Sequence, residues 1–321
     1  MCRRRIRRRV GSHWPVCTVR EHVGPDDSTT ADAKVHSYYI FCPSSALVTC
    51  PFAMTDGAAR LLSRHLAPPR SVPQTQALDF TAVTLTEDER EAETSRRVFK
   101  RAYNRLTSRF PNIRWTNGQW MTERPGGLDG ARTETTAVYR PFSGPMAERP
   151  EQEMGPWVVN GHKFFSSATD SDMAIFLART EGNKRLSAFY APMRMPNGDS
   201  NGVRITRLKP KMGTRALPSA EIELKGMRAW LIGHEGDGIR EISTILGVTR
   251  VHNSICAVSF MRRALSVAKV RCSRFSTSIP PPLLSVLRSD RRHTRRSSRH
   301  LVGASCARRL CTFARSPRWS C

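Results

Sequence analysis

Apolar residues recur at helical spacing in the first third of the chain. One set falls at positions i, i+4, i+7, i+8 and i+12, the spacing of a single helix face. The tandem Pro68-Pro69 ends this predicted helix, because proline lacks an amide hydrogen. The residues of this face are Met54, Ala58, Leu61, Leu62 and Leu66.

A second helix is predicted farther along the chain. Thr86 and Glu89 have the spacing of a capping box, in which the threonine oxygen accepts from a first-turn amide and the glutamate reaches back. Pro111 marks the end of this helix. One apolar face continues through Val98, Ala102 and Leu106.

From Trp115 the hydrophobic period changes to two, which is typical of half-buried strands. Asn160-Gly161 is predicted to be the turn of a hairpin, because both central residues of a type I′ turn need positive φ. Several short strands at regular spacing indicate an antiparallel barrel or sandwich. The predicted strands are 156–159, 162–165, 173–178, 186–191, 202–208 and 221–224.

After this β region the helical period returns. The glycine-rich segment 233–238 is predicted to be a strand-to-helix turn, since no βαβ unit surrounds it and a dinucleotide site is not indicated. Beyond Val270, consecutive prolines and scattered arginines end the pattern. The apolar positions of this last helix are Ile239, Ile242, Ile245 or Leu246, Ile255, Val258, Met261 and Leu265.

Positive charge is concentrated at the two ends of the chain. The net charge is +25, and residues 271–321 contain twelve Arg, no Lys and one acid, Asp290. Residues 1–36 add seven Arg. Two interpretations follow: disordered basic arms that neutralise nucleic-acid phosphates, or terminal sequence translated out of frame or through an intron. We favour the second, because the family resemblance described below breaks off within a helix near Val270 and not at a linker.

Composition argues against two other classes of protein. The nine cysteines are odd in number and lack Cys-x-x-Cys spacing or paired histidines, so a metal site is not indicated. The chain has no run of about 18 apolar residues, so no membrane-spanning helix is predicted.

Four motifs occur in an order and spacing that resemble the acyl-CoA dehydrogenases. Each motif alone is weak, but four in register over roughly 150 residues are specific, and the resemblance as a whole covers about residues 38–270. The Phe-Phe-Ser element, and Val248-Thr249-Arg250 in the last helix, are most similar to the alkylation-response, AidB-like branch of that family. The motifs are Met121-Thr122-Glu123-x-x-Gly126-Gly127, Asn160-Gly161-His162-Lys163-Phe164-Phe165-Ser166, Lys209-x-x-Met212-Gly213-x-Arg215 and Gly233-x-Glu235-Gly236-x-Gly238.

The resemblance implies an α+β, acyl-CoA dehydrogenase-like fold. A helical segment, a middle antiparallel β barrel or sandwich and the start of a C-terminal helical bundle would lie between disordered basic ends. The expected domains are a disordered Arg-rich N-terminus (1–36), a remnant of the N-terminal helical domain (37–114), a flavin-binding middle β domain (115–233), the start of the C-terminal helical domain (234–270) and a disordered Arg/Ser-rich tail (271–321).

The resemblance also implies FAD as the cofactor. Backbone amides and a hydroxyl of the first motif would face the polar edge of the flavin, and the second motif would cover the ring. Since alternate strand residues face opposite sides, only one of Phe164 and Phe165 is expected to touch the ring, while the other lies in the core. The implied cofactor-binding residues are Gln119, Met121, Thr122, Gly127, Phe165, Ser166 and Ser167.

The implied reaction is the α,β-dehydrogenation of an acyl thioester such as an acyl-CoA, with a carboxylate as base. No catalytic residue is assigned, because the family's glutamate lies in the C-terminal bundle, and Glu235 and Asp237 are expected to be solvated. Leu128 stands where the family usually has a serine that serves the pyrophosphate, so weaker FAD affinity is expected. We therefore predict a chain that is inactive by itself. The alternatives are a DNA-binding flavoprotein-like protein that uses its basic ends, or a pseudoenzyme; the oligomeric state is left open.

Overall fold

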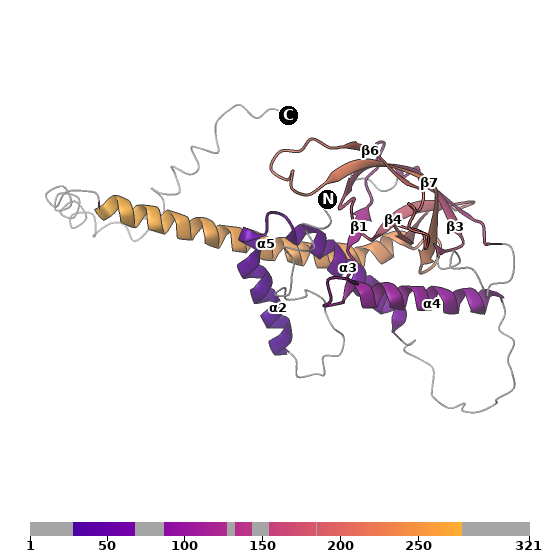
Figure 1. Ribbon diagram of the computed structural model, residues 1–321, viewed down its shortest axis with the longest axis horizontal. Helices are drawn as coiled ribbons and strands as arrows, with labels where there is room; N and C mark the ends of the chain where they lie inside the picture. Colours follow the sequence, from indigo (N-terminus) through magenta and orange to yellow (C-terminus); the bar gives the residue numbers. More distant parts are fainter. Residues whose placement is uncertain (1–27, 68–86, 127–131, 143–153, 184, 278–321) are drawn as a thin grey trace, which may run out of the picture. The chain divides into compact units, whose positions relative to one another are not determined.

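The computed structural model describes residues 28–67, 87–126, 132–142, 154–183 and 185–277 (Figure 1). The chain divides into two units, Met1–Phe260 and Met261–Cys321, and the first contains every strand of the described part. The helices are α2 (Ser28–Phe41), the short η1 (Cys42–Ser44), α3 (Thr49–Leu66), α4 (Glu87–Leu106) and α5 (Gly238–Thr277). The strands are β1 (Asn117–Trp120), β2 (Thr136–Tyr139), β3 (Trp157–Ser167), β4 (Met173–Thr180), β5 (Leu186–Pro192), β6 (Val203–Leu208) and β7 (Ser219–Ile232).

Two helices extend into segments that the sequence predicts to be disordered. α2 begins at Ser28 and α5 continues to Thr277. The extensions, 28–36 and 271–277, contain neither proline nor glycine, so nothing in them interrupts the helical hydrogen bonds. None of the described helices has the length and apolar character needed to cross a membrane.

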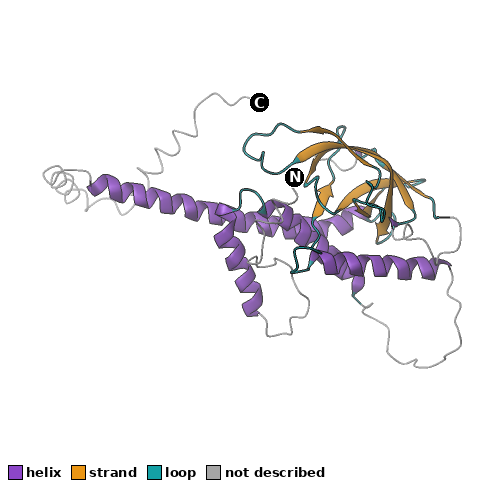
Figure 2. Cartoon of the chain, viewed as in Figure 1, coloured by secondary structure: helices purple, strands orange, loops and turns teal. Residues whose placement is uncertain are grey.

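The strands form one sheet that closes into a barrel (Figure 2). β4 pairs with antiparallel β5 on one side, and with β1 and then β2, both parallel, on the other. The ring continues through the antiparallel pairs β2–β3, β3–β7 and β5–β7, and β6 adds to β7 outside it. The predicted α+β fold with a middle β barrel is confirmed, although β4 has parallel neighbours on one side.

β4 separates two hydrophobic cores, and this explains its continuous apolar sequence. One core lies inside the barrel, and the other lies between the sheet and helices α3, α4 and α5. A strand buried on both faces shows no alternation of polar and apolar residues. The helix-facing side chains of β4 are Met173, Ile175 and Leu177, and the interior side chains are Ala174, Phe176 and Ala178.

The predicted hairpin at Asn160-Gly161 is wrong. β3 runs through this position without a turn, and its register against β7 shifts between Val159 and Gly161. The Asn-Gly pair therefore forms a bulge in a continuous strand. A Cβ at Gly161 would lie 2.4 Å from Thr135 Oγ1, so glycine is needed here for the close approach of a neighbouring segment.

A buried ion pair fastens the segment after β1 to β3. Lys163 Nζ lies 2.5 Å from Glu123 Oε1, and the two side chains are 0% and 2% exposed. The ammonium also donates to the Leu177 carbonyl at 2.8 Å. Glu123 accepts from Thr135 Oγ1 at 2.5 Å and from the Glu134 amide at 2.6 Å. Both charges are thus compensated inside the barrel, which desolvation requires.

Burial and pairing shift the pKa values of both groups. Burial acts to raise the pKa of Glu123, but the Lys163 charge and the hydrogen bonds outweigh it, and the pKa lies below its usual range. For Lys163, burial is the larger effect and lowers the pKa, although Glu123 opposes it.

We expect Lys163→Met to lower the free energy of unfolding by about 3 kcal/mol or more at pH 7, because it leaves a buried carboxylate without its cation. The double variant Lys163→Met/Glu123→Gln should lose less than the sum of the single variants, as measured by a urea double-mutant cycle. Lys225→Met, at an exposed position of β7, is the control and should stay within about 0.5 kcal/mol of wild type. A loss at Lys163 no larger than that at Lys225 would refute the role of the pair.

The lowered pKa of Glu123 also predicts a pH dependence. A carboxyl whose folded pKa is depressed contributes stability that is present above its unfolded pKa and is lost as the pH falls through the folded pKa. Wild type should therefore lose this contribution below about pH 4.5, and Glu123→Gln should lose less over the same range. Urea midpoints at pH 6, 4.5 and 3.5 measure the difference, and identical slopes in the two proteins would contradict the assignment.

Candidate functional site

The end of β3 and the segment after β1 meet at one place on the barrel. Thr122 and Phe165 form an isolated antiparallel bridge, and the Phe164 amide donates to the Thr122 carbonyl at 3.0 Å. The Trp120 indole N–H donates to the Ser167 carbonyl at 3.1 Å. The two sequence motifs are therefore hydrogen-bonded neighbours, and we call this meeting of residues 120–122 with 164–167 the strand junction.

Ser166 places a buried hydroxyl at the strand junction. The residue is 0% exposed, and its Oγ has no hydrogen-bond partner within the part of the chain that the structure describes. An unsatisfied buried hydroxyl costs about 1–3 kcal/mol. A polar ligand atom at this position would complete the missing hydrogen bond.

Both phenylalanines of the second motif lie outside the core. The register of β3 against β7 shifts between Lys163 and Ser166, which interrupts the alternation of the strand. Phe165 is 41% exposed. Phe164 is half-buried, with Lys209 Nζ 3.3 Å from the centre of its ring. The expectation that one phenylalanine fills the core is wrong, because the bulge removes the alternation on which it relied.

The other predicted cofactor-binding residues lie close to the junction in the chain. Gln119 is half-buried on β1, and Met121 is partly buried against the core beneath the helices. The Ser167 hydroxyl is already partnered, since it shares a hydrogen bond of 2.6 Å with Ser219. Gly127 lies outside the described residues. The structure thus brings Thr122, Phe165, Ser166 and Ser167 together, with Gln119 and Met121 on the adjoining strand segment.

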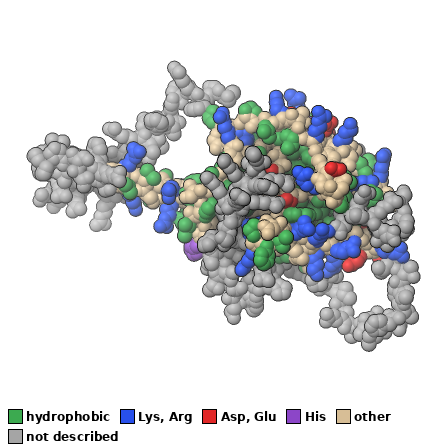
Figure 3. Space-filling view, viewed as in Figure 1, with side chains coloured by type: hydrophobic (Ala, Val, Ile, Leu, Met, Phe, Trp, Pro, Cys, Tyr) green, Lys and Arg blue, Asp and Glu red, His purple; other side chains and the backbone are tan. Residues whose placement is uncertain are grey.

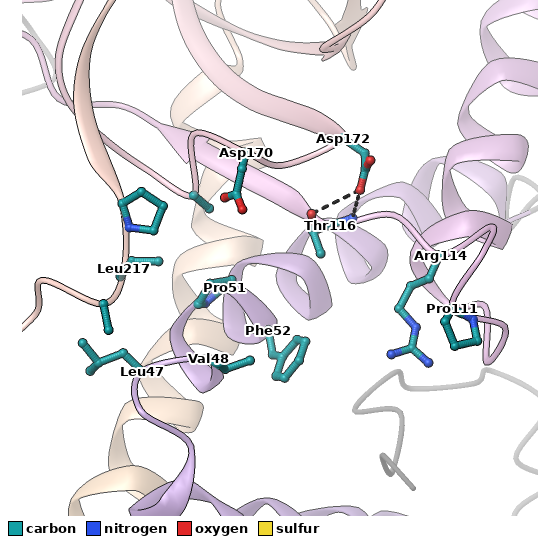
Figure 4. A pocket seen from close by; sticks show the side chains of 13 residues that line it. Leu47, Val48, Pro51, Phe52, Pro111, Arg114, Thr116, Asp170, Asp172 and Leu217 are labelled. Carbon is teal, nitrogen blue, oxygen red and sulfur yellow. Dashed lines mark hydrogen bonds between the residues drawn. The ribbon is translucent and has the colours of Figure 1, made fainter. Parts of the chain in front are cut away.

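A mostly apolar cavity of about 130 Å³ opens next to the end of β3 (Figure 4). Ala168, which lines it, directly follows Ser167 of the strand junction. The walls come from the start of α3 and from loops that precede β1, follow β3 and precede β7. Sequence reasoning predicted the helix α3 but not this cavity, because the loop residues that line it carry no periodic pattern. Lining residues include Leu47, Pro51, Phe52, Thr116, Ala168 and Leu217.

Residues with strained backbone conformations lie at or next to this cavity. In the described residues, the non-glycine positions with positive φ are Ala46 (46°), Leu47 (72°) and Ala168 (55°). Leu47 and Ala168 line the cavity, and Ala46 precedes Leu47. Such conformations cost on the order of 1–3 kcal/mol and cluster at ligand-binding places. No sequence pattern marks them, because alanine and leucine normally avoid this region.

Carboxylates near the site are held by other groups or face solvent. At the cavity, Asp172 Oδ2 accepts from the amide and hydroxyl of Thr116 at 3.0 and 3.3 Å (Figure 4). Glu235 is exposed, and Asp237 lies 3.7 Å from Arg240 in a partly exposed ion pair. Glu235 and Asp237 are thus in contact with solvent, as the sequence predicts.

Comparison with known proteins gives a consistent result. Residues 118–227 match the family described as acyl-CoA dehydrogenase, middle domain. The chain is 36% identical over 245 residues to acyl-CoA dehydrogenase family member 11 of Caenorhabditis elegans, an alignment that covers 74% of this chain and 34% of that protein. It is 40% identical over 151 residues to the putative acyl-CoA dehydrogenase AidB of Escherichia coli K12, covering 47% of this chain and 25% of AidB.

The fold is also shared with solved structures. The structure of Caenorhabditis elegans ACDH-11 in complex with C11-CoA matches with a TM-score of 0.59 at 33% identity, covering 77% of this chain and 37% of that one. The chain spans only 25% to 34% of the length of the two curated relatives. Residues 118–227 thus carry the middle domain of the acyl-CoA dehydrogenases, and over the matched span the chain is similar in sequence and fold to members of that family.

Proposed function

We propose that the middle domain, residues 115–233, holds the isoalloxazine ring of FAD at the strand junction. Acyl-CoA dehydrogenases are FAD-dependent, and the chain shares their barrel and motifs. The observation that carries the proposal is the buried Ser166 hydroxyl, which has no partner within the described residues and lies beside the bridge between Thr122 and Phe165. A flavin edge rich in polar atoms is a fitting partner for such a hydroxyl.

The residues of the junction have separate tasks in this proposal. The Thr122 and Ser166 hydroxyls orient the polar edge of the ring, and the exposed part of Phe165 covers a flat face. The Lys163–Glu123 pair keeps the two chain segments in register beneath them. When bound, FAD would accept a hydride, and hydrogen-bond donors at its edge stabilise the charge that develops there.

We propose that Leu128 weakens the binding of FAD. Leucine offers neither a donor nor an acceptor to the pyrophosphate, so that group would depend on backbone amides alone. Leu128 lies outside the described residues, and this assignment follows from the sequence motif.

We further propose that the ligand is an acyl thioester whose acyl chain enters the apolar cavity. ACDH-11 of Caenorhabditis elegans has been solved with C11-CoA. The cavity begins at Ala168, one residue beyond the strand junction, and Pro51, Phe52 and Leu217 give it apolar walls. Binding pockets for hydrophobic ligands are apolar with a few polar groups that fix orientation. The reaction class is α,β-dehydrogenation.

We also propose that this 321-residue chain does not catalyse that reaction by itself. A general base must be within hydrogen-bond reach of the proton that it removes. Glu123 is committed to Lys163, and Asp172 accepts two hydrogen bonds from Thr116. Glu235 is exposed. These carboxylates do not meet the requirement.

The flavin proposal predicts opposite effects of one substitution on stability and on binding. Ser166→Ala removes an unpartnered buried hydroxyl, so the free protein should be as stable as wild type or slightly more stable. The same change should weaken FAD binding about fivefold to tenfold, the equivalent of one lost hydrogen bond. Quenching of flavin fluorescence measures the affinity, and urea unfolding measures the stability.

Thr180→Val is the matched control, because Thr180 Oγ1 is also buried and without a partner in the described structure. It should leave FAD affinity unchanged. Equal FAD affinities of wild type and Ser166→Ala would remove Ser166 from the site, and failure of wild type to bind FAD at all would overturn the proposed function.

The second prediction concerns turnover. The purified chain, loaded with FAD, should give no reduction of a dye acceptor above background with butyryl-CoA or undecanoyl-CoA, because Glu123, Asp172 and Glu235 do not meet the requirement for a base. Butyryl-CoA dehydrogenase from Megasphaera elsdenii serves as the positive control. Measurable turnover would contradict the proposed inactivity, and Asp170 at the cavity would then be the first acid to replace by asparagine.

On the face of the molecule shown in Figure 3, Lys and Arg side chains lie at several separate places among the described residues. The nucleic-acid alternative rests on residues 1–36 and 271–321, of which the structure describes only 28–36 and 271–277. No observation on the described residues favours that alternative, and we do not propose it.

A further inference from the structure

Two cysteines that are 214 positions apart in the chain lie against each other. Cys42 begins η1 and Cys256 lies on α5, and their sulfur atoms are 2.7 Å apart. Both belong to the unit Met1–Phe260. They are free thiols in this structure, and nothing in their sequence spacing marks them as partners.

The distance of 2.7 Å between the two sulfur atoms is unusually short for thiols that are not bonded. Heavy atoms in van der Waals contact lie about 3.5–4.0 Å apart, whereas the bond of a disulfide is about 2.05 Å. The two sulfurs are thus already closer to bonding distance than to ordinary contact. Bond formation needs only a small further approach of two groups that the fold holds in place.

We propose that Cys42 and Cys256 form a reversible disulfide that ties η1 to α5. This inference stands apart from flavin binding, because it rests on thiols that take no part in the strand junction. The oxidant is a low-molecular-weight disulfide of the glutathione class, which exchanges with protein thiols.

The surroundings decide which thiol reacts first. Cys42 is 1% exposed, and burial together with the neighbouring Cys256 raises the pKa of Cys42 to about 12. Cys256 is half-exposed.

The Cys256 thiolate therefore attacks the small disulfide, breaking its S–S bond and releasing one small thiolate. Cys42 then loses its proton to solvent, attacks Cys256 Sγ and expels the second small thiol. Both cysteines are oxidised, and the small disulfide is reduced to two thiols.

A hydrogen-bonded cluster holds the pair in position. The Cys256 thiol donates to the Tyr38 hydroxyl at 3.3 Å, and that hydroxyl donates to the Thr49 carbonyl at 3.2 Å. Tyr38 packs edge-on against His252, one helical turn before Cys256, with ring centres 4.6 Å apart. The cluster therefore spans α2, α3 and α5, so the sulfurs are positioned by three elements.

The bridge would act on the apolar cavity through the chain. Cys42 is followed closely by Ala46 and Leu47, which both have positive φ, and Leu47 lines the cavity. Fixing Cys42 to α5 restricts the movement of this strained turn. The thiol state is thereby coupled to the shape of the cavity.

The test uses the full chain incubated with oxidised glutathione, then alkylated and digested with trypsin. We expect the peptide 35–60 to be linked to the peptide 251–262, with the mass lowered by two hydrogens, and dithiothreitol to reverse the link. Oxidation should raise the Tm by about 5 to 10 °C, because the bridge closes a long loop. Cys42→Ser and Cys256→Ser should each abolish the link and the rise in Tm.

Cys50→Ser is the matched control, since Cys50 is exposed and lies on the same tryptic peptide as Cys42. The link should persist in this variant. Loss of the link in Cys50→Ser, its persistence in Cys42→Ser, or a stable glutathione adduct on Cys256 would overturn the proposal. Fragmentation of the linked wild-type peptide locates the bonded cysteine directly, so the test holds even if Cys42→Ser does not fold.

Discussion

The buried Lys163–Glu123 pair is the interaction on which the site depends. A charge without water must be compensated, and each partner here meets the other and additional hydrogen-bonding groups at 2.5–2.8 Å. Lys163 projects from β3 into the barrel, and Glu123 follows Thr122 in the chain. The pair therefore sets how the segment after β1 lies along β3. The bridge between Thr122 and Phe165 is formed one residue from Glu123, so its position is fixed by the same contact.

The closed barrel holds in place the strands that carry the Lys163–Glu123 ion pair. β4 supplies apolar side chains to the barrel interior on one face and to the helix-packed core on the other. The sheet therefore cannot shift its register without exposing apolar residues. In the ring of strands, β3 departs from the regular register against β7 at two places, between Val159 and Gly161 and between Lys163 and Ser166. The strand junction lies at the second of these departures and not on a regular part of the barrel.

The cavity joins the strand junction to the helices. Ala168 continues from β3 into its wall, and Leu47 approaches from the turn between η1 and α3. Both residues hold positive φ, so the surrounding packing must offset their strain. The same turn follows Cys42, whose thiol meets Cys256 of α5. The strand junction, the cavity and the thiol pair are thus linked through short stretches of chain.

The sequence by itself determined the helical and strand periods, the family motifs, and the identity of the residues at the junction. Those features are local, because a period or a motif is written in neighbouring residues. Only the tertiary structure decided that Asn160-Gly161 is a bulge, that Phe164 and Phe165 both lie outside the core, and that the Ser166 hydroxyl has no partner among the residues that the structure describes. The sequence also did not indicate that Lys163 pairs with Glu123 or that Cys42 lies against Cys256. These outcomes depend on strand register and on contacts between residues far apart in the chain, which no local pattern encodes.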